Sequence, residues 1–346
     1  APELKRVVIG VDPPVSENGD TCGIIAVGLG IDFNHLAVLR GSLDDFFQVD
    51  LVAVATEEQP AGGVAEHRHA RVLDGADDPR GMICDMLGAR LHMVSAAEAS
   101  LRNLGACLMR CDLEVEELVS APFAAGLATL VEDEKQLGAT VIDMGGGTTS
   151  LAVFSEGHLV HTAQIPVGGG QVTNDLATIL STPVAHAERM KTLHGAVHGG
   201  ADDEREYLPV PLLGEDEHHI ARIPRAMVVG IIKPRLEETF ELIKERLDQS
   251  GLGKEGGARV ILTGGASQLV GVREMAARIL DRQVRLGRPQ PLRGLAEAAS
   301  GPAFAGAVGL LMWGAGEGRP VLDIAPGPVK SGGAVRRLIH WLKDRV

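Results

Sequence analysis

A run of three glycines between two apolar segments constrains the fold of this chain more than any other feature. The segment TVIDMGGGTTSLAVF, residues 140–154, has an apolar run ending in Asp143, then the glycines, two threonines and a second apolar run. Both runs have the composition of β-strands, so we predict a β-hairpin. Three consecutive glycines make a poor turn for stability alone, because glycine loses the most conformational freedom on folding. We therefore favour a ligand-binding loop over an ordinary glycine-rich turn.

The ligand that fits this loop is a phosphate group. The loop consists of Gly145, Gly146, Gly147, Thr148 and Thr149. The glycines can adopt positive φ angles and have no Cβ atoms, so successive N–H groups can approach an anion, and the threonines add hydroxyl donors. Asp143 is expected at the end of the strand, where a carboxylate can hold a hydrated Mg²⁺ that bridges to phosphate. P-loops and dinucleotide fingerprints continue into a helix, whereas a strand follows here.

A second glycine element lies in RVILTGGASQLVGV, residues 259–272. A strand from Val260 to Thr263 leads into Gly264, Gly265, Ala266 and Ser267, after which a helix is expected. Helix N-termini with small residues accept ribose or phosphate oxygens. Turns of this kind also serve close packing alone, so it is the position of the element after the first loop that makes it informative.

Between the two glycine elements, PRLEETFELIKERLDQSG at 234–251 has the periodicity of an amphipathic helix. The apolar stripe consists of Leu236, Thr239, Phe240, Ile243 and Leu247. Most charged residues lie outside this stripe and are expected to be solvated. Arg235 and Glu238 are the candidates that can reach a purine.

The C-terminal segment predicts a tethered amphipathic helix. GEGRPVLDIAPGPVKSGG, residues 316–333, is rich in Gly and Pro and is typical of a flexible linker. AVRRLIHWLKDRV, residues 334–346, has an apolar and a basic face on a chain of net charge −13, which favours an anionic lipid surface at about 1 kcal/mol per Lys or Arg. The alternative is a helix that packs on its own domain. The candidate membrane-binding residues are Val335, Arg336, Arg337, Leu338, Ile339, Trp341, Leu342, Lys343, Arg345 and Val346.

Composition narrows the possible functions. A chain of 346 residues with 45% hydrophobic residues can bury large cores, and its length suggests two lobes. The acidic balance and 3% aromatic content argue against nucleic acid as a partner. There is no run of eighteen apolar residues and no signal peptide, so we expect neither a membrane span nor export. The histidine pairs lack a third ligand, so no metal beyond Mg²⁺ is assigned.

From about Val72 to Val346 the chain resembles the bacterial cell-division family FtsA, whose members are actin-like and bind ATP. The matching segments occur in the family's order. They are 77–82 (DDPRGM), 92–130, 143–154 (DMGGGTTSLAVF), 165–195, 262–272 (LTGGASQLVGV) and 301–313 (GPAFAGAVGLLMW). IPVGGGQVTNDLA with HAERMKTLHG, within 165–195, is the part most specific to this family. The triple-glycine loop itself is shared with heat-shock chaperones and other filament formers.

The resemblance implies an α/β, actin-like fold of two lobes, a duplicated ribonuclease H-like unit, with a C-terminal amphipathic helix. It implies these parts: an atypical N-terminal hairpin and first-lobe remnant (1–66), a subdomain 1C-like remnant with the first connecting helix (67–138), a second lobe with a subdomain 2B-like insert (139–313), a flexible linker (314–333) and a membrane-binding helix (334–346). Gly264, Gly265, Ala266 and Ser267, with Arg235 and Glu238, become the expected adenosine site.

The resemblance also implies a function in cell division. The expected cofactors are ATP and Mg²⁺, and the expected role is a membrane anchor that recruits and tethers the FtsZ ring. Its partners would be the C-terminal peptide of FtsZ, bound within about 171–230, further copies of the chain, other divisome proteins and anionic lipid. The expected location is the cytoplasmic face of the inner membrane at the septum.

The N-terminal segment departs from the family pattern. RVVIGVDPPVSENGDTCGIIAVGLGID keeps a strand–turn–strand order, with Asp12 at the end of the first strand, but lacks the family's Gly-Thr/Ser phosphate loop. Pro13 and Pro14 have no N–H groups to offer a phosphate. Residues 1–40 instead resemble the start of the nuclease domain of phage terminase large subunits. Asp12 is retained as a second candidate for the Mg²⁺ site.

Catalysis is not assigned to any residue. In SAPFAAGLATL the chain has Ala121 where many relatives carry Glu, and no general base is evident. ATP binding with weak or no hydrolysis is therefore expected. Two alternatives stay open: an actin-like ATPase of the chaperone or sugar-kinase type, and a terminase-like nuclease that uses Asp12 and another carboxylate to bind two metals.

Overall fold

The computed structural model describes residues 4–12, 23–30, 36–42, 53–54, 67–72, 89–96, 98–113, 115, 118–215, 220–252 and 256–315. Before Leu101, side chains are described only for His92 and Val94. The chain divides into two compact units, Ala1–His69 with Leu91–Gly318, and Ala70–Arg90 with Arg319–Val346. The packing reported below is that of the first unit.

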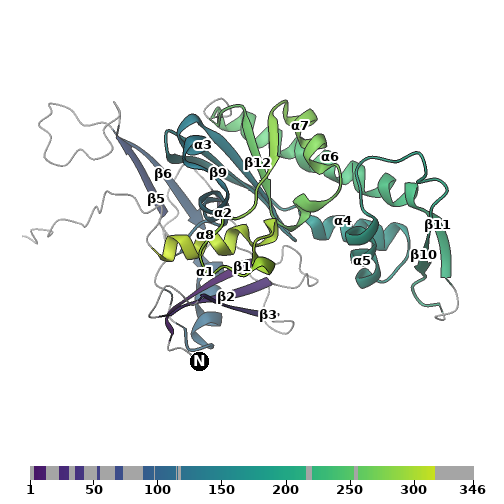
Figure 1. Cartoon of the computed structure of the whole chain (residues 1–346), viewed down its shortest axis with the longest axis horizontal. Helices are drawn as coiled ribbons and strands as arrows, with labels where there is room; N and C mark the ends of the chain where they lie inside the picture. The colour runs from purple at the N-terminus through teal and green to yellow at the C-terminus, as the bar shows by residue number, and fades with distance from the viewer. Residues whose placement is uncertain are drawn as a thin grey trace, which may run out of the picture. The chain divides into compact units, whose positions relative to one another are not determined.

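The main sheet has five strands in the order β13–β12–β7–β8–β9 (Figure 1). The strands are β7 (Ala139–Met144), β8 (Thr149–Ser155), β9 (His158–Ile165), β12 (Arg259–Thr263) and β13 (Gln283–Leu286). β7 is antiparallel to β8 and parallel to β12. The carboxyl ends of β7 and β12 therefore lie at the same edge of the sheet, with Asp143 opposite Thr263.

Helices cover both faces of this sheet. They are α2 (Ala121–Thr129), α4 (Gly169–Ile179), α5 (Val184–His194), α6 (Arg225–Ser250), α7 (Val272–Leu280) and α8 (Ala305–Gly314). Ile142 and Val153 belong to the apolar cluster shared with α4, α5, α6 and α7, whereas Val141 and Phe154 belong to the cluster shared with α2 and α8. Successive strand residues point to opposite faces, so the nearly continuous apolar sequence of β7 and β8 supplies both cores.

The helices α2 and α8 pack closely together (Figure 1). A Cβ atom at Gly309 would collide with the carbonyl oxygen of Ala124, so this crossing requires glycine. Phe123 and Trp313 meet edge to face, with ring centroids 5.5 Å apart. The two helices thus form one layer, although the chain between them builds most of the opposite face.

An insert follows α5. It contains the hairpin of β10 (Tyr207–Pro211) and β11 (Ile220–Pro224), which pair antiparallel. Leu208 and Val210 are buried, while Tyr207 is 58% exposed. The alternation of inward and outward residues gives this hairpin one face toward the core and one toward solvent.

The N-terminal segment forms an antiparallel meander of β1 (Leu4–Asp12), β2 (Gly23–Gly30) and β3 (Leu36–Ser42). The two predicted strands are therefore present, and the segment between them, 13–22, lies outside the described residues. The remaining elements are β4 (Ala53–Val54), β5 (His67–Val72), β6 (Ala89–Ala96), α1 (Glu98–Met109), α3 (Glu132–Leu137) and the 3₁₀ turns η1 (Gly265–Gln268), η2 (Glu297–Ala299) and η3 (Pro302–Phe304). β4 pairs antiparallel with the end of β6.

The helix predicted over 234–251 is longer than the sequence pattern indicated. It begins at Arg225 and runs through Pro234 to Ser250. The interior proline lacks the N–H that would bond to the carbonyl of Gly230, but both residues are exposed, so water can reach that carbonyl. The predicted stripe from Leu236 to Leu247 is buried, and buried Val228, Val229 and Ile232 extend it past the proline.

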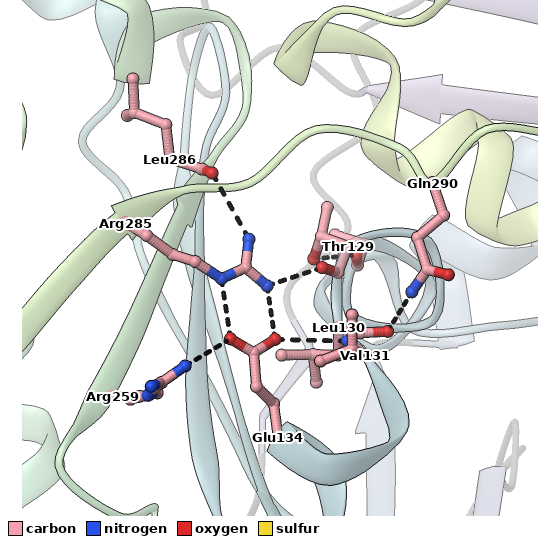
Figure 2. A network of polar contacts seen from close by, with 9 residues as sticks. Thr129, Leu130, Val131, Glu134, Arg259, Arg285, Leu286 and Gln290 are labelled. Atoms are coloured by element: carbon pink, nitrogen blue, oxygen red, sulfur yellow. Dashed lines mark hydrogen bonds and ion pairs between the residues drawn. The ribbon is translucent and has the colours of Figure 1, made fainter.

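A polar network joins the end of α2 to α3 and to β13 (Figure 2). Glu134, only 5% exposed, accepts hydrogen bonds from Arg285 and from the N–H of Val131, and lies 3.5 Å from the guanidinium of Arg259. Arg285 also donates to the carbonyl of Thr129 at 2.8 Å. Burial by itself would raise the pKa of Glu134, but the bonds and charge of Arg285 outweigh it and lower that pKa.

Among the residues that the structure describes, no helix is long and apolar enough to cross a membrane.

Candidate functional site

The predicted hairpin around the three glycines is confirmed. β7 and β8 pair antiparallel, with Met144 opposite Thr149, so the strand continues one residue past Asp143. The loop is closed by a 2.9 Å hydrogen bond from the N–H of Gly145 to the carbonyl of Thr148. Gly146 at the tip of the loop is exposed, and a Cβ placed there would meet no atom within 4 Å. The tip is therefore open to a ligand.

The N-terminus of α4 sets the orientation of the loop. The N–H of Gly169 donates to the carbonyl of Gly145 at 2.9 Å, and the N–H of Gly170 donates to the carbonyl of Gly146 at 2.7 Å. In a trans peptide the C=O of one residue and the N–H of the next point in opposite directions. The N–H groups of Gly146 and Gly147 are therefore turned away from α4, as two adjacent donors.

Two reasons were expected for glycine in this loop, positive φ angles and the absence of Cβ atoms, and the structure does not show the first. The positive-φ glycines of the described residues include Gly264 but none of Gly145, Gly146 and Gly147. None of the three loop glycines adopts a positive φ, and the close approach at this site is made by a glycine outside the loop. The tightest approach is at Gly168, where an added Cβ would lie 2.5 Å from the carbonyl oxygen of Gly146 and 2.8 Å from that of Gly145.

The two threonines of the loop have different surroundings. Thr149 is 2% exposed, and its hydroxyl donates to the carbonyl of Val167 at 2.7 Å. That bond occupies the only proton of the hydroxyl, so in this geometry Thr149 holds the segment before α4 rather than offering a donor to a phosphate. Thr148 is partly exposed. It is the threonine that keeps the predicted position at the loop surface.

The structure brings the second glycine element to Asp143. Oδ1 of Asp143 occupies the space that a Cβ at Gly264 would fill, and Gly264 has φ +85°, a backbone conformation that favours glycine. A Cβ at Gly306, near the start of α8, would lie 4.0 Å from Oδ2 of the same carboxylate. The N–H of Gly264 is held by the carbonyl of Pro302 at 3.1 Å. Two segments distant in sequence, the Gly264 turn and the start of α8, thus converge on Asp143.

The segment after β12 is not the start of a long helix. Gly265 to Gln268 form the single 3₁₀ turn η1, and α7 begins only at Val272. Ser267 and Ala266 are buried, and the Ser267 hydroxyl donates to the carbonyl of Gly264 at 2.7 Å. Gly265 is exposed, so the backbone at this position is the part of the predicted adenosine site that faces solvent.

Arg235 and Glu238, the predicted purine contacts, lie together on α6. Arg235 donates from Nε and Nη2 to the carboxylate of Asp175 at 2.6 and 3.0 Å, and from Nη1 to Glu238 at 2.6 Å. The hydrogen bonds from Arg235 to Asp175 raise the pKa of the guanidinium further. In this arrangement Arg235 joins α4 to α6, and Glu238, whose side chain is 55% exposed, is the one that faces solvent.

A second polar group stands beside the first turn of α4. Lys191 of α5 donates to the carbonyl of Gly169, to the hydroxyl of Thr173 and to Glu188. Burial alone would raise the pKa of Glu188, but hydrogen bonds from Lys191 and Thr173 outweigh it and lower that pKa. From the sequence, Gly168, Gly169 and Lys191 were not assigned to the nucleotide site. The signal was the GGG of IPVGGGQ, a second glycine run directly before a predicted helix.

Some predicted residues cannot be placed in this site. β1 ends at Asp12, but the side chain of Asp12 lies outside the described part of the chain, as do residues 335–346 of the predicted membrane helix and the linker at 316–333. No group of three or more His, Cys, Asp or Glu residues suited to a metal occurs among the described residues. Of the two carboxylates predicted for Mg²⁺, Asp143 is the one whose side chain the structure describes.

Comparison with known proteins gives the family. The family model described as "Cell division protein FtsA" matches residues 140–309, a span that contains the hairpin, the Gly264 turn and the first half of α8. FtsA of Escherichia coli (strain K12) is 30% identical over 353 residues, covering 93% of this chain and 82% of the relative. FtsA of Agrobacterium fabrum is 45% identical over 280 residues, which cover 78% of this chain but only 62% of that relative. For FtsA of Rhizobium meliloti the identity is 49%, over 54% of the relative.

Solved structures share the fold at low sequence identity. The PilM–PilN type IV pilus biogenesis complex matches with a TM-score of 0.58 and 16% identity, over 89% of this chain and 98% of the matched chain. MreB 5 of Spiroplasma citri matches with a TM-score of 0.53 and 16% identity, over 90% and 96% of the two chains.

The α/β, actin-like fold class predicted from the sequence is confirmed, while the C-terminal helix lies outside the described residues. The resemblance to the cell-division family is likewise confirmed by the family model and by the relatives. This chain belongs to the family of cell division protein FtsA.

Proposed function

We propose that the chain binds Mg²⁺–ATP between the glycine hairpin and the Gly264 turn, and that it anchors FtsZ to the membrane during division. The observation that carries the nucleotide site is the pair of N–H groups at Gly146 and Gly147. They are turned away from α4 because α4 holds the carbonyls of Gly145 and Gly146. Adjacent backbone donors beside a carboxylate form a suitable set for a phosphate and its metal ion.

The donor set fits Mg²⁺. Asp143 supplies a hard oxygen ligand at the edge where β7 and β12 end, and Gly264 leaves room for its carboxylate. The ion would neutralise phosphate charge, while the hairpin donors bind the phosphate oxygens. The similar fold of MreB 5, whose structure is described as bound to AMPPNP, supports the proposal of nucleotide binding.

We propose binding with weak or no hydrolysis. Ala121 is the first residue of α2, and a methyl side chain can neither orient a water molecule nor accept its proton. Nucleotide would then control conformation or assembly rather than supply turnover.

The partner-binding part of the proposal concerns the insert within 171–230. The hairpin of β10 and β11 exposes Tyr207 and Ile220, 58% and 53% exposed, and Leu213 after β10 is 67% exposed. Exposed apolar residues gathered on one element are typical of a site for a short peptide. We assign the C-terminal peptide of FtsZ to this insert, and membrane attachment to residues 334–346 through the linker 314–333. We also propose the remaining parts that were predicted from the sequence. They are the N-terminal hairpin and first-lobe remnant (1–66), the subdomain 1C-like remnant with the first connecting helix (67–138) and the second lobe (139–313).

The nucleotide site is tested by calorimetry with Mg²⁺–ATP. Wild type should show saturable binding, and Asp143→Ala should weaken it by about tenfold or more, since a metal ligand is removed. Asp133→Ala changes an exposed carboxylate in α3 and should leave the affinity unchanged. Absence of saturable binding by the folded wild type would refute the proposed site.

The anchor is tested separately with vesicles and peptide. Wild type should float with vesicles that contain anionic lipid but not with neutral ones, and Leu338→Asp should abolish flotation. Tyr207→Ser with Ile220→Ser should weaken binding of an FtsZ C-terminal peptide, whereas Leu137→Ser, a change at an 83% exposed residue of α3, should not. Equal flotation with both lipid compositions, or equal peptide binding by all variants, would contradict this part.

A further inference from the structure

Lys191 is a largely buried lysine with every donor in use. Its side chain is 12% exposed, and its ammonium lies 2.9 Å from the carbonyl oxygen of Gly169, 2.8 Å from the hydroxyl of Thr173 and 2.6 Å from Oε2 of Glu188. A lysine ammonium has three N–H donors, and three acceptors are present here. Lys191 therefore acts on the protein around it, not on a ligand.

Gly169 connects this lysine to the hairpin. Its carbonyl accepts from Lys191, while its N–H donates to the carbonyl of Gly145. Space around Gly169 is limited, since an added Cβ would lie 3.2 Å from Cβ of Ala266 and 3.5 Å from Nζ of Lys191. The first turn of α4 is thus held from both sides, by α5 through Lys191 and by the hairpin through Gly145.

The charge of Lys191 is balanced within the same group. Glu188 lies one turn before it on α5, accepts from both Lys191 and Thr173, and is the only acidic partner of Lys191 among the described residues. Thr173 in turn lies on α4, with its hydroxyl 3.2 Å from the carbonyl of Gly169. The ion pair lies within α5, and its hydrogen bonds with Gly169 and Thr173 fasten α5 to α4 at the turn that contacts the loop.

We propose that Lys191 is a positioning residue for the phosphate loop, an inference that rests on the proposed nucleotide function. By fixing the carbonyl of Gly169, it keeps the N–H groups of Gly169 and Gly170 on the carbonyls of Gly145 and Gly146. The N–H groups of Gly146 and Gly147 then stay turned toward the phosphate. Lys191 touches no part of the nucleotide and acts only through α4.

The test compares Mg²⁺–ATP with adenosine, which has no phosphate. Lys191→Met should weaken the affinity for Mg²⁺–ATP by about tenfold or more, which is the effect of losing one charge-assisted hydrogen bond. The affinity for adenosine should stay unchanged. Lys191→Arg keeps a charged donor and should recover most of the ATP affinity. Lys244→Met, the same change at an exposed lysine of α6, is the matched control. Circular dichroism and thermal unfolding verify that each variant is folded.

The possible results distinguish failure of the inference about Lys191 from failure of the proposed nucleotide binding. Wild type that binds ATP together with Lys191→Met that binds it equally well would overturn the inference alone. A parallel loss of affinity for ATP and for adenosine in a folded Lys191→Met variant would also overturn the inference. That result would indicate direct contact with the nucleoside or a general loss of structure. Failure of the wild type to bind ATP would overturn the proposed function and the inference together.

Discussion

The guanidinium of Arg285 donates two hydrogen bonds to the carboxylate of Glu134, one of 2.7 Å from Nε and one of 2.5 Å from Nη2 (Figure 2). The pair ties α3 to β13, and Arg285 reaches the end of α2 through the carbonyl of Thr129. Because α2 packs on α8 and β13 continues the sheet through β12, this contact fixes the layer behind the proposed nucleotide site.

Loss of the Glu134 charge should destabilise the fold. Glu134→Gln leaves Arg285 and Arg259 without their carboxylate, and we expect the free energy of unfolding to fall by about 2–4 kcal/mol. Glu132→Gln, on the same helix, removes a carboxylate that is 71% exposed and pairs with Lys135, so its effect should stay within about 0.5 kcal/mol. Urea unfolding measures both. Equal effects of the two changes would show that the buried pair adds no stability.

The stability should depend on pH through two histidines. The rings of His92 and His161 have centroids 6.2 Å apart, and Nε2 of His92 lies 3.1 Å from the Thr162 hydroxyl. Burial, with a smaller effect of His161, lowers the pKa of His92 from 6.5 to about 4, and burial also lowers the pKa of His161. The unfolded chain therefore binds more protons below about pH 6.5, so the free energy of unfolding should decrease as pH falls toward 4.

Urea unfolding between pH 5 and 7 isolates this effect, because the lowered pKa values of Glu134 and Glu188 place their titration below that range. His92→Gln should reduce the slope of unfolding free energy against pH. An unchanged slope would mean that His92 is protonated equally in the folded and unfolded chains.

The two loop threonines should separate stability from binding. Thr149→Val removes a buried hydroxyl that donates to Val167, so the free energy of unfolding should fall by about 1 kcal/mol. Thr148→Val changes a partly exposed residue and should weaken the binding of ATP without a comparable loss of stability. Thermal unfolding and calorimetry of both variants give the comparison. The reverse pattern would assign the phosphate contact to Thr149.

Alanine substitutions at Gly146 and Gly168 should also separate an effect on stability from an effect on ATP affinity. A Cβ at Gly168 would press on the carbonyls of Gly145 and Gly146, so Gly168→Ala should lower both the unfolding temperature and the ATP affinity. A Cβ at Gly146 meets open space in the protein but would stand where phosphate approaches, so Gly146→Ala should lower affinity alone. Full ATP binding by Gly146→Ala would place the phosphate elsewhere.

Much of the site could be predicted because local patterns determine it. The hairpin at Asp143 follows from two apolar runs around three glycines, whereas the meeting of Asp143 with Gly264 is known only from the parallel pairing of β7 with β12. The stripe from Leu236 to Leu247 was predicted correctly because helical periodicity is strong there.

The errors arose where tertiary contacts override local preference. The start of α6 was missed because Pro234 normally ends a helix, whereas here its solvent-facing position allows the helix to continue. The role of Thr149 depends on Val167, 18 residues away, and the role of Gly168 depends on the carbonyls of a loop more than 20 residues earlier. Such contacts leave no periodic signal in the sequence.

The central claim is that the N–H groups of Gly146 and Gly147 bind the phosphate, and amide chemical shifts test it most directly. We would label the full chain with ¹⁵N-glycine, assign these two amides with Gly146→Ala and Gly147→Ala, and titrate Mg²⁺–ATP and adenosine. We expect the amide resonances of Gly146 and Gly147 to show the largest chemical-shift changes and to saturate together. Only the phosphate-bearing ligand should change them. Saturable ATP binding that leaves these two amides unmoved would contradict this claim.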